Sequence, residues 1–204
     1  EVESKQAALA TARASVLAKA EAVMEEALKP LSGVYREVEM MSRPDLENCL
    51  RLLCTKPTAL VASAVLILVQ GMPLHDEVRS WQHDYANAMR NSRFLRSLVD
   101  YDKDFQPGPR VELARRRLEQ IAEERCTCDR WSTASETLLQ WVSGMVTYHE
   151  KEKAAQPFKD SLRELDQSQV ELCQEADACQ RRWDAAWEDL KEIPAASLEK
   201  EEIK

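Results

Sequence analysis

Apolar residues recur at helical spacing in the first part of the chain, and charged and small residues fill the positions between them. Val2, Leu9, Val16 and Val23 follow one another at seven-residue intervals. A second series with steps of four and three then begins, and it comprises Met24, Leu28, Leu31, Tyr35 and Val38. An interrupted heptad pattern predicts one long helix over residues 2–41 whose apolar stripe shifts in register near Pro30 and Gly33.

The last part of the chain has the most regular pattern. From Phe158 to Ile193, mostly apolar or small residues alternate steps of four and three without a break, which predicts a helix with a seam of about five heptads. Pro157 is expected to mark the start of this helix and Pro194 its end. The seam consists of Phe158, Leu162, Leu165, Gln169, Leu172, Ala176, Cys179, Trp183, Ala186, Leu190 and Ile193.

Between these two patterns, Pro and Gly residues divide a densely apolar stretch into short segments. Residues 59–69 are almost uniformly apolar, which predicts a buried helix that starts after Thr55-Lys56-Pro57 and ends at Gly71. This run is too short to cross a bilayer. Ser42 or Asp45 is expected to cap the short helix that precedes this buried one. Further short helices are expected over residues 46–53, 76–89, 111–121 and 130–148, with a loop at 122–129.

Residues 91–105 predict a short amphipathic helix with a basic outer face. At about 100° per residue, Arg93, Arg96 and Asp100 fall on one side of this helix. The opposite, apolar side comprises Phe94, Leu95, Leu98, Val99 and Tyr101. Pro107-Gly108-Pro109 follows and is expected to stop it. The rest of the chain is interpreted as a framework that holds this segment at the surface.

These elements together predict an all-α protein. Two long helices that flank one compact insert either pair with other chains or fold back on each other. Folding back costs less entropy because the insert already brings their ends together. We therefore expect an antiparallel coiled-coil stalk capped by a small globular bundle of about six helices. The expected division is a first stalk helix at residues 1–44, the bundle at 45–150 and a second stalk helix at 151–204.

Composition and charge exclude several functions. The net charge of −8 argues against nucleic acid as the main partner, and no signal peptide or membrane span is visible. From Lys56 to Tyr148 the basic and acidic residues balance, so the flanking helices hold the excess acid. The six cysteines lack zinc-site spacing and are expected to be reduced thiols, so no metal or cofactor is predicted. No GxxxxGK(S/T) loop and no paired acid and base groups are present, so no enzymatic activity is expected.

Several short motifs follow one another over most of the chain. They are Asp45-Leu46-Glu47, Lys56-Pro57 through Gly71, Trp81 with Phe94-Leu95, Tyr101-Asp102-Lys103-Asp104, Asp129-Arg130 through Trp141, and Gln156-Pro157-Phe158-Lys159. Their order resembles that in the stalk and microtubule-binding domain of dynein heavy chains, and of axonemal members in particular. Each motif alone is weak, and their order and spacing make the resemblance specific. Thr58, Ala62 and Gln140 depart from it, at places where the family usually has Pro, Lys and a basic residue.

The resemblance implies a microtubule-binding tip and distal stalk of a motor protein, with sliding between the two stalk helices switching its affinity for α/β-tubulin. The parent heavy chain would be an AAA+ ATPase that works in the cytoskeleton of the cytoplasm and in the axoneme of cilia and flagella. A leucine-rich-repeat light chain, which some outer-arm members carry on this tip, is a second expected partner. The expected tubulin contacts are Lys56, Arg90, Arg93, Arg96 and Arg130.

Three other interpretations stay open at this stage. The three arginines of residues 90–96 could simply be solvated, with Asp100 pairing Arg96 along the helix. Arg115-Arg116-Arg117 resembles a flank of the surface more than a contact. The whole chain could also be a non-motor structural coiled-coil tether or scaffold, which unbroken heptads through the middle would favour and its Pro and Gly breaks oppose.

Overall fold

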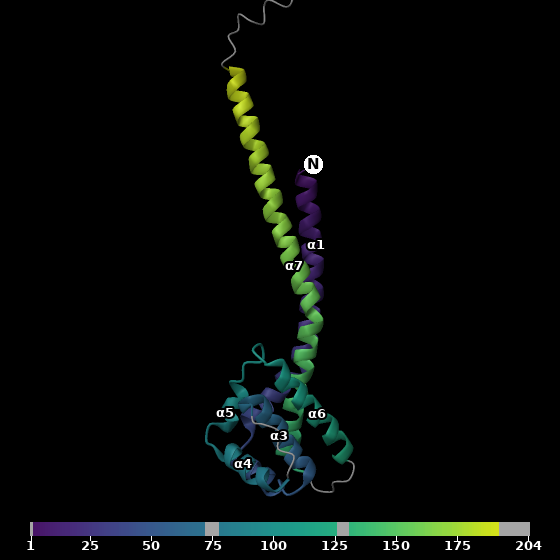
Figure 1. Cartoon of the computed structure of the whole chain (residues 1–204), viewed down its shortest axis with the longest axis vertical. Helices are drawn as coiled ribbons and strands as arrows, with labels where there is room; N and C mark the ends of the chain where they lie inside the picture. The colour runs from purple at the N-terminus through teal and green to yellow at the C-terminus, as the bar shows by residue number, and fades with distance from the viewer. Residues whose placement is uncertain (1, 72–77, 126–130, 192–204) are drawn as a thin grey trace, which may run out of the picture. The chain divides into compact units, whose positions relative to one another are not determined.

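The structure, a computed structural model, describes residues 2–71, 78–125 and 131–191 (Figure 1). All regular secondary structure in these residues is helical, which confirms the all-α prediction. The chain divides into two compact units. Unit 1 combines Glu1–Ala20 with Pro157–Lys204, and unit 2 is Glu21–Gln156. The boundaries expected from the sequence, at 44/45 and 150/151, stay predictions.

Unit 1 contains the first part of helix α1 (Val2–Met40) and the later part of helix α7 (Thr133–Lys191). The two segments lie side by side, as Figure 1 shows, and the Arg13 guanidinium is 2.6 Å from the Asp166 carboxylate. Leu9 of α1 and Leu172 of α7 line one shared groove. These contacts bring the two helices together within unit 1, while the expected coiled-coil stalk stays a prediction.

The later seam positions of α7 are exposed. Trp183 is 66% exposed and Leu190 is 58% exposed. Trp187, beside the seam, stacks on Trp183 with ring centroids 6.4 Å apart. The regular heptad pattern therefore continues beyond the part of α7 that α1 covers in the described residues.

Unit 2 is a bundle around α3 (Lys56–Gln70), whose residues from Pro57 to Leu68 are all buried. Pro57 occupies the first turn of α3, and Gly71 ends the helix in the left-handed conformation with φ 65°. Helix α3 packs against α6 (Gly108–Arg125) and α4 (Val78–Arg90), and α4 also contacts α2 (Arg43–Arg51) and α5 (Phe94–Val99). A capping box of Ser42 and Asp45 begins α2, which confirms the predicted cap.

Three sequence predictions were wrong in extent. The amphipathic helix is α5 alone and does not run over residues 91–105. Helix α6 continues over residues 122–125, which had been expected to lie in a loop, because Ala, Glu and Arg favour helix there. Helix α7 passes without a break through Pro157, which had been expected to start a separate helix. A proline inside a helix costs about 3 kcal/mol, and the strong helix formers around it outweigh that cost.

The face that α1 buries in unit 2 differs from the predicted series. Leu31 and Val38 are buried as expected, but Leu28 is 39% exposed. Ala27 and Val34 are buried instead. The buried side chains Ala27, Leu31, Val34 and Val38 follow steps of four, three and four. The stripe therefore keeps Leu31 and Val38 but has Ala27 and Val34 in place of the predicted Leu28 and Tyr35.

Candidate functional site

A tight turn places the three arginines of residues 90–96 close together. Arg90 is the last residue of α4, and Arg93 directly precedes α5. The Asn91 side chain accepts a hydrogen bond from the Arg93 backbone N–H at 2.9 Å, and the Asn91 carbonyl accepts one from Phe94 at 3.0 Å. Asn favours such a turn because its side chain replaces a backbone acceptor. The turn therefore joins α4 and α5 directly, with arginines on both sides of it.

Burial of the apolar face of α5 fixes its outer face. Phe94 and Leu98 are buried, and Leu95 and Val99 pack at the edge of the core. Leu95 and Val99 also line a shallow groove with Val38 and Glu39, so α5 borders the end of α1. Because a helix of this length shows one narrow apolar stripe, Arg93 and Arg96 must lie at the surface. This part of the sequence prediction is confirmed.

The arginine surface, which we define as Arg43, Arg90, Arg93 and Arg96, has four cations and, in the described part of the chain, only two carboxylates within ion-pair distance of them, Glu47 and Asp100. Arg96 pairs with Asp100 at 3.1 Å, but both side chains are mostly exposed. Glu47 lies 3.9 Å from Arg90 and 4.0 Å from Arg43. Among the described residues, no carboxylate lies within ion-pair distance of Arg93. Exposed pairs of this kind stabilise by less than about 1 kcal/mol, so they can exchange partners readily.

Arg43 was missed in the sequence analysis. Its guanidinium donates a 2.6 Å hydrogen bond to the backbone carbonyl of Arg90, which joins the start of α2 to the end of α4. The sequence shows Arg43 only as the residue after the helix cap. No sequence signal places it beside Arg90, because the two are 47 positions apart.

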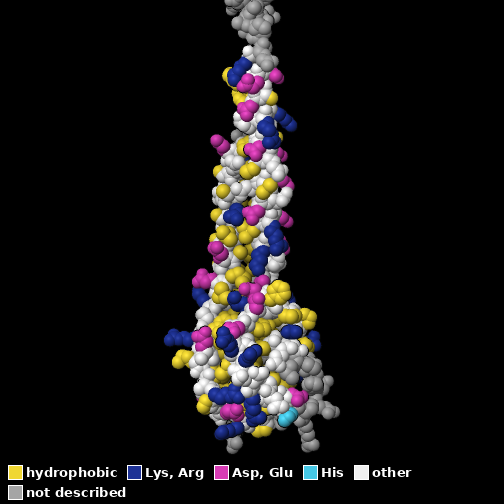
Figure 2. Space-filling view, turned by 90° about the vertical axis from the view of Figure 1, so that its left-hand side faces the viewer, with side chains coloured by type: hydrophobic (Ala, Val, Ile, Leu, Met, Phe, Trp, Pro, Cys, Tyr) yellow, Lys and Arg dark blue, Asp and Glu magenta, His cyan; other side chains and the backbone are white. Residues whose placement is uncertain are grey.

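A groove of about 780 Å³ lies next to α5. Its lining includes the basic Arg93 and Arg96, the acidic Asp100 and Asp102, and hydroxyl-bearing Ser and Tyr residues. The lining residues are Val69, Ser92, Arg93, Arg96, Ser97, Asp100, Tyr101 and Asp102. Figure 2 shows one face of unit 2, on which Lys and Arg side chains gather in the lower part of the view with acidic side chains among them.

The structure does not bring Lys56 to the arginine surface. Lys56 begins α3 and forms an ion pair with Glu124 of α6. The groove beside α5 meets α3 at Val69, thirteen residues later, which corresponds to ~20 Å along a helix axis. Lys56 is therefore an exposed cation at the opposite end of α3. The other expected contact, Arg130, lies outside the described residues.

The segment after α5 is fixed to α7 through a buried tyrosine. The Tyr148 hydroxyl donates a hydrogen bond to the Asp104 carboxylate, and the Lys103 ammonium lies 5.6 Å from the centre of the Tyr148 ring. Burial, together with the nearby negative charge of Asp104, raises the pKa of Tyr148. Gln106 completes the contact with a 3.5 Å hydrogen bond to the sulfur of Met145.

The same segment also contacts α3 and approaches α1. The Tyr101 hydroxyl donates to the Leu68 carbonyl at 3.2 Å, and its ring meets Trp141 edge-on at 5.5 Å between centroids. Burial and the charge of Asp104 raise the pKa of Tyr35 in α1 to about 12. The segment from Tyr101 to Gln106, which we call the strap, therefore links α5 to the long helices.

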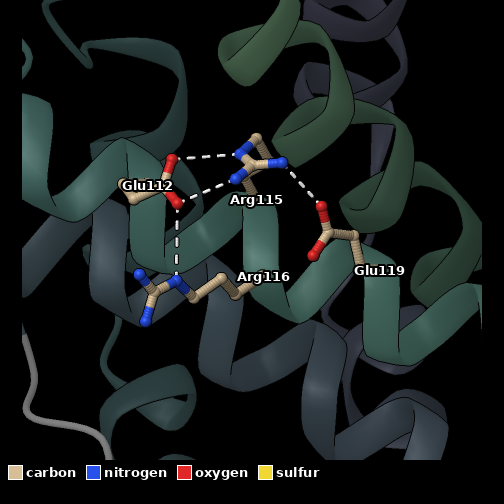
Figure 3. Close-up of polar contacts among 4 residues, drawn as sticks. All are labelled: Glu112, Arg115, Arg116 and Glu119. Atoms are coloured by element: carbon tan, nitrogen blue, oxygen red, sulfur yellow. Dashed lines mark hydrogen bonds and ion pairs between the residues drawn. The ribbon is translucent and has the colours of Figure 1, made fainter.

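Figure 3 shows how the arginine run on α6 is engaged. Arg115 makes two hydrogen bonds to Glu112, at 2.8 and 3.0 Å, and one to Glu119 at 2.6 Å. Arg116 contacts the same Glu112 at 3.4 Å. The adjacent guanidinium groups lower the pKa of Glu112 to about 2. These cations are matched by acids of their own helix, which fits the interpretation of a flank.

No protein-family model matches the chain. The curated proteins likewise include none that matches it. Within the described ranges, no three His, Cys, Asp or Glu side chains are grouped so that they would hold a metal ion. None of the helices described is both long and apolar enough to span a membrane.

The exposed groups of the arginine surface are guanidinium and carboxylate side chains at and beside a short helix whose apolar face is buried. Long-range attraction from exposed guanidinium groups increases the rate of encounter with an acidic surface. Added salt screens this attraction and lowers the rate. The arginine surface is therefore a candidate for contact with an acidic macromolecule.

Proposed function

We propose that the chain is the microtubule-binding tip and distal stalk of a dynein heavy chain of axonemal type. Its partner is the microtubule, at the surface of α/β-tubulin. The main supporting observation is the arginine surface, in which Arg93, directly before α5, and Arg96 on α5 lie beside Arg90 and Arg43. The order of the short motifs supports the same assignment. The fragment itself catalyses nothing, and ATP hydrolysis belongs to the AAA+ ring of the parent motor protein.

Charge complementarity explains why this surface suits tubulin. The outer surface of a microtubule is strongly acidic, and Arg93 has no carboxylate partner among the described residues that would have to be displaced. Arg90 and Arg96 exchange weak intramolecular pairs for intermolecular ones, so breaking the intramolecular pairs costs little. Binding of this kind has fast association and a strong dependence on ionic strength.

The remaining expected contacts are supported by different observations. Lys56 is exposed but paired with Glu124, so it contributes only if tubulin replaces that carboxylate. Arg130 belongs to the proposed contact set on the strength of the sequence motif alone. A leucine-rich-repeat light chain remains a second proposed partner, and Phe105, which is 87% exposed on the strap, offers it an apolar contact. Neither nucleic acid nor membrane is part of the proposal.

Affinity is proposed to be switched by sliding α1 against α7, which would act as the two strands of the stalk. The strap supports this route because it connects α5 to Tyr148 of α7 and approaches Tyr35 of α1. A displacement of either long helix would then change how α5 is held. Two discrete registers with different tubulin affinities would give the reciprocal coupling that such a switch requires.

A non-motor coiled-coil tether is the alternative, and one observation favours it. Trp183 and Trp187 form an exposed stacked pair on α7, as a helix that binds other helical proteins would have. This alternative gives the arginine surface no specific role. It therefore predicts that the arginines can be replaced without loss of binding to the natural partner.

Microtubule co-sedimentation at low and moderate salt tests the proposal. The test variant replaces Arg90, Arg93 and Arg96 by Glu. A matched control replaces Arg163, Arg181 and Arg182 by Glu; these are exposed arginines of α7 in unit 1, so the net charge changes equally. We expect salt-sensitive pelleting of the native chain, loss of pelleting in the test variant, and retention in the control.

Equal effects of the two triple variants would mean that net charge alone drives association, and would remove the assignment of the arginine surface. If the native chain stays in the supernatant even with α1 and α7 cross-linked in several registers, the motor assignment fails. The tether would then be the better account.

A further inference from the structure

Gly144 lies in the interior of helix α7, where glycine is less favourable than alanine. Its environment explains it. A Cβ atom on Gly144 would lie 2.6 Å from Cδ2 and 3.2 Å from Cγ of Leu31 in α1. Leu31 is only 1% exposed, so other side chains surround it and a shift would have to displace them. The absence of a side chain at residue 144 therefore forms a notch that the Leu31 side chain fills.

Contacts on both sides of this notch set how α1 and α7 align within unit 2. Lys151 of α7 pairs with Glu26 of α1 at 3.0 Å. Toward the other end, the Thr137 hydroxyl donates to Glu37 at 3.4 Å. Residue numbers rise along one helix as they fall along the other, so the helices are antiparallel here. The Lys151–Glu26 pair is at the surface and weak, and the Thr137–Glu37 hydrogen bond is part-buried but long, whereas the Leu31 side chain at the notch is fully buried.

We infer that the insertion of Leu31 into the Gly144 notch selects the register of α1 against α7, so that these two are positioning residues. A slip along the buried stripe, by four or three residues (about 6 or 4.5 Å), would place either Ala27 or Val34 over Gly144. Both side chains are smaller than that of Leu31 and would leave a void at the notch. The observed register is the one in which the side chain fits the notch.

The register matters for the candidate site because the end of α1 borders α5. Val38 and Glu39 share a groove with Leu95 and Arg96. A slip that moves Ala27 to the place of Leu31 would also move Val38 past α5 and alter its support. This consequence for tubulin affinity rests on the proposed function. The register selection itself does not depend on it.

Replacement of Gly144 by Ala reverses the preference between registers. In the observed register the new methyl group collides with Leu31. In the slipped register the same methyl fills the void above Ala27. Shortening Leu31 to Ala removes both colliding atoms, so the double variant accepts the observed register again. An ordinary glycine in a helix would behave oppositely, because replacement by Ala would simply stabilise the helix.

The first test is a double-mutant cycle by urea unfolding. We expect Gly144→Ala to lower the urea midpoint in the presence of Leu31 and to raise it in the Leu31→Ala background. This reversal of sign comes only from direct contact between the two side chains. If Gly144→Ala raises the midpoint in both backgrounds, the notch does not exist and the inference is wrong.

The second test measures register directly, without microtubules. Exposed Cys54, Cys173 and Cys179 are first replaced by Ser, together with Cys126 and Cys128. A short bis-thiol reagent then compares two engineered pairs: Glu26→Cys with Lys151→Cys, which reports the observed register, and Ala22→Cys with Lys151→Cys, which reports the slipped one.

With Gly144 intact, we expect the pair at 26 and 151 to cross-link faster. Gly144→Ala should shift the yield toward the pair at 22 and 151, and adding Leu31→Ala should restore the original ratio. An unchanged ratio in a folded Gly144→Ala variant would overturn register selection by the notch.

Co-sedimentation of the same variants separates this inference from the proposed function. If both hold, Gly144→Ala changes the microtubule concentration for half-saturation by about fivefold or more, and the double variant reverses the change. A shifted cross-linking ratio without any microtubule binding by the native chain would support the notch and overturn the proposed function. Microtubule binding by the native chain together with an unshifted cross-linking ratio in Gly144→Ala would support the proposed function and overturn the notch.

Discussion

Replacing Tyr148 by Phe tests whether the strap is held to α7 by a hydrogen bond. The substitution deletes the hydroxyl that donates to Asp104 and keeps the ring under Lys103. Tyr148 is 3% exposed, so the aromatic packing that remains is nearly complete. The change therefore isolates the polar contact from the apolar one.

The expected loss follows from the surroundings of the two groups. A hydrogen bond to a charged group contributes about 1.5–3 kcal/mol to folding. The Asp104 side chain is 60% exposed and lies 3.4 Å from Lys103, so water and the ammonium can solvate it after the loss. We therefore expect the lower end, ~1.5 kcal/mol. With a urea slope of about 2 kcal/mol/M, the midpoint should fall by ~0.7 M.

Fluorescence-detected urea unfolding measures this shift. Trp183 and Trp187 are first replaced by Phe, so that the remaining tryptophans (Trp81, Trp131 and Trp141) all belong to unit 2. Tyr35→Phe is the control, because it deletes the same atom from a second tyrosine of unit 2, one that is half-buried. A midpoint shift in Tyr148→Phe no larger than that in Tyr35→Phe would refute the claim that the hydroxyl anchors the strap.

Three further predictions concern pH, capping and surface charge. Tyr35 ionises at a pKa of about 12 in the folded chain and ~10 in the unfolded chain, so its contribution to stability is complete below about pH 10 and is lost as pH rises toward 12. Urea midpoints measured across this range should fall less steeply for Tyr35→Phe. Ser42→Ala removes the cap of α2 and should cost ~1 kcal/mol, whereas Ser42→Gly should cost only a few tenths; equal losses would contradict the capping role. Arg115→Gln breaks a network that is exposed to solvent, so its urea midpoint should change by less than ~0.3 M, and a larger change would show that the network is structural.

The sequence by itself determined that the chain is helical, that α3 is buried and which side of α5 faces the core. The uniform apolar run predicted that α3 is interior, and Gly71 predicted its end, because only glycine adopts φ 65° there without strain. The outward direction of Arg93 and Arg96 followed from the spacing of Phe94 and Leu98. These features depend on neighbours in the sequence, so local patterns are sufficient to predict them.

Helix ends and exact stripes were less predictable. The continuation of α7 through Pro157 depends on the balance between one unfavourable residue and many favourable ones. The burial of Ala27 in place of Leu28 depends on what packs against α1. Local propensity does not include that partner.

Only the tertiary structure decided which distant groups meet. Periodicity shows which face of a helix is buried but not which residue of another helix faces it. Three contacts therefore had no sequence signal: the hydrogen bond from the Arg43 guanidinium to the Arg90 carbonyl, the hydrogen bond from Tyr148 to Asp104, and the insertion of Leu31 at Gly144. Each depends on loop closure and close packing over the whole of unit 2, where a difference of one methyl group changes which arrangement fits.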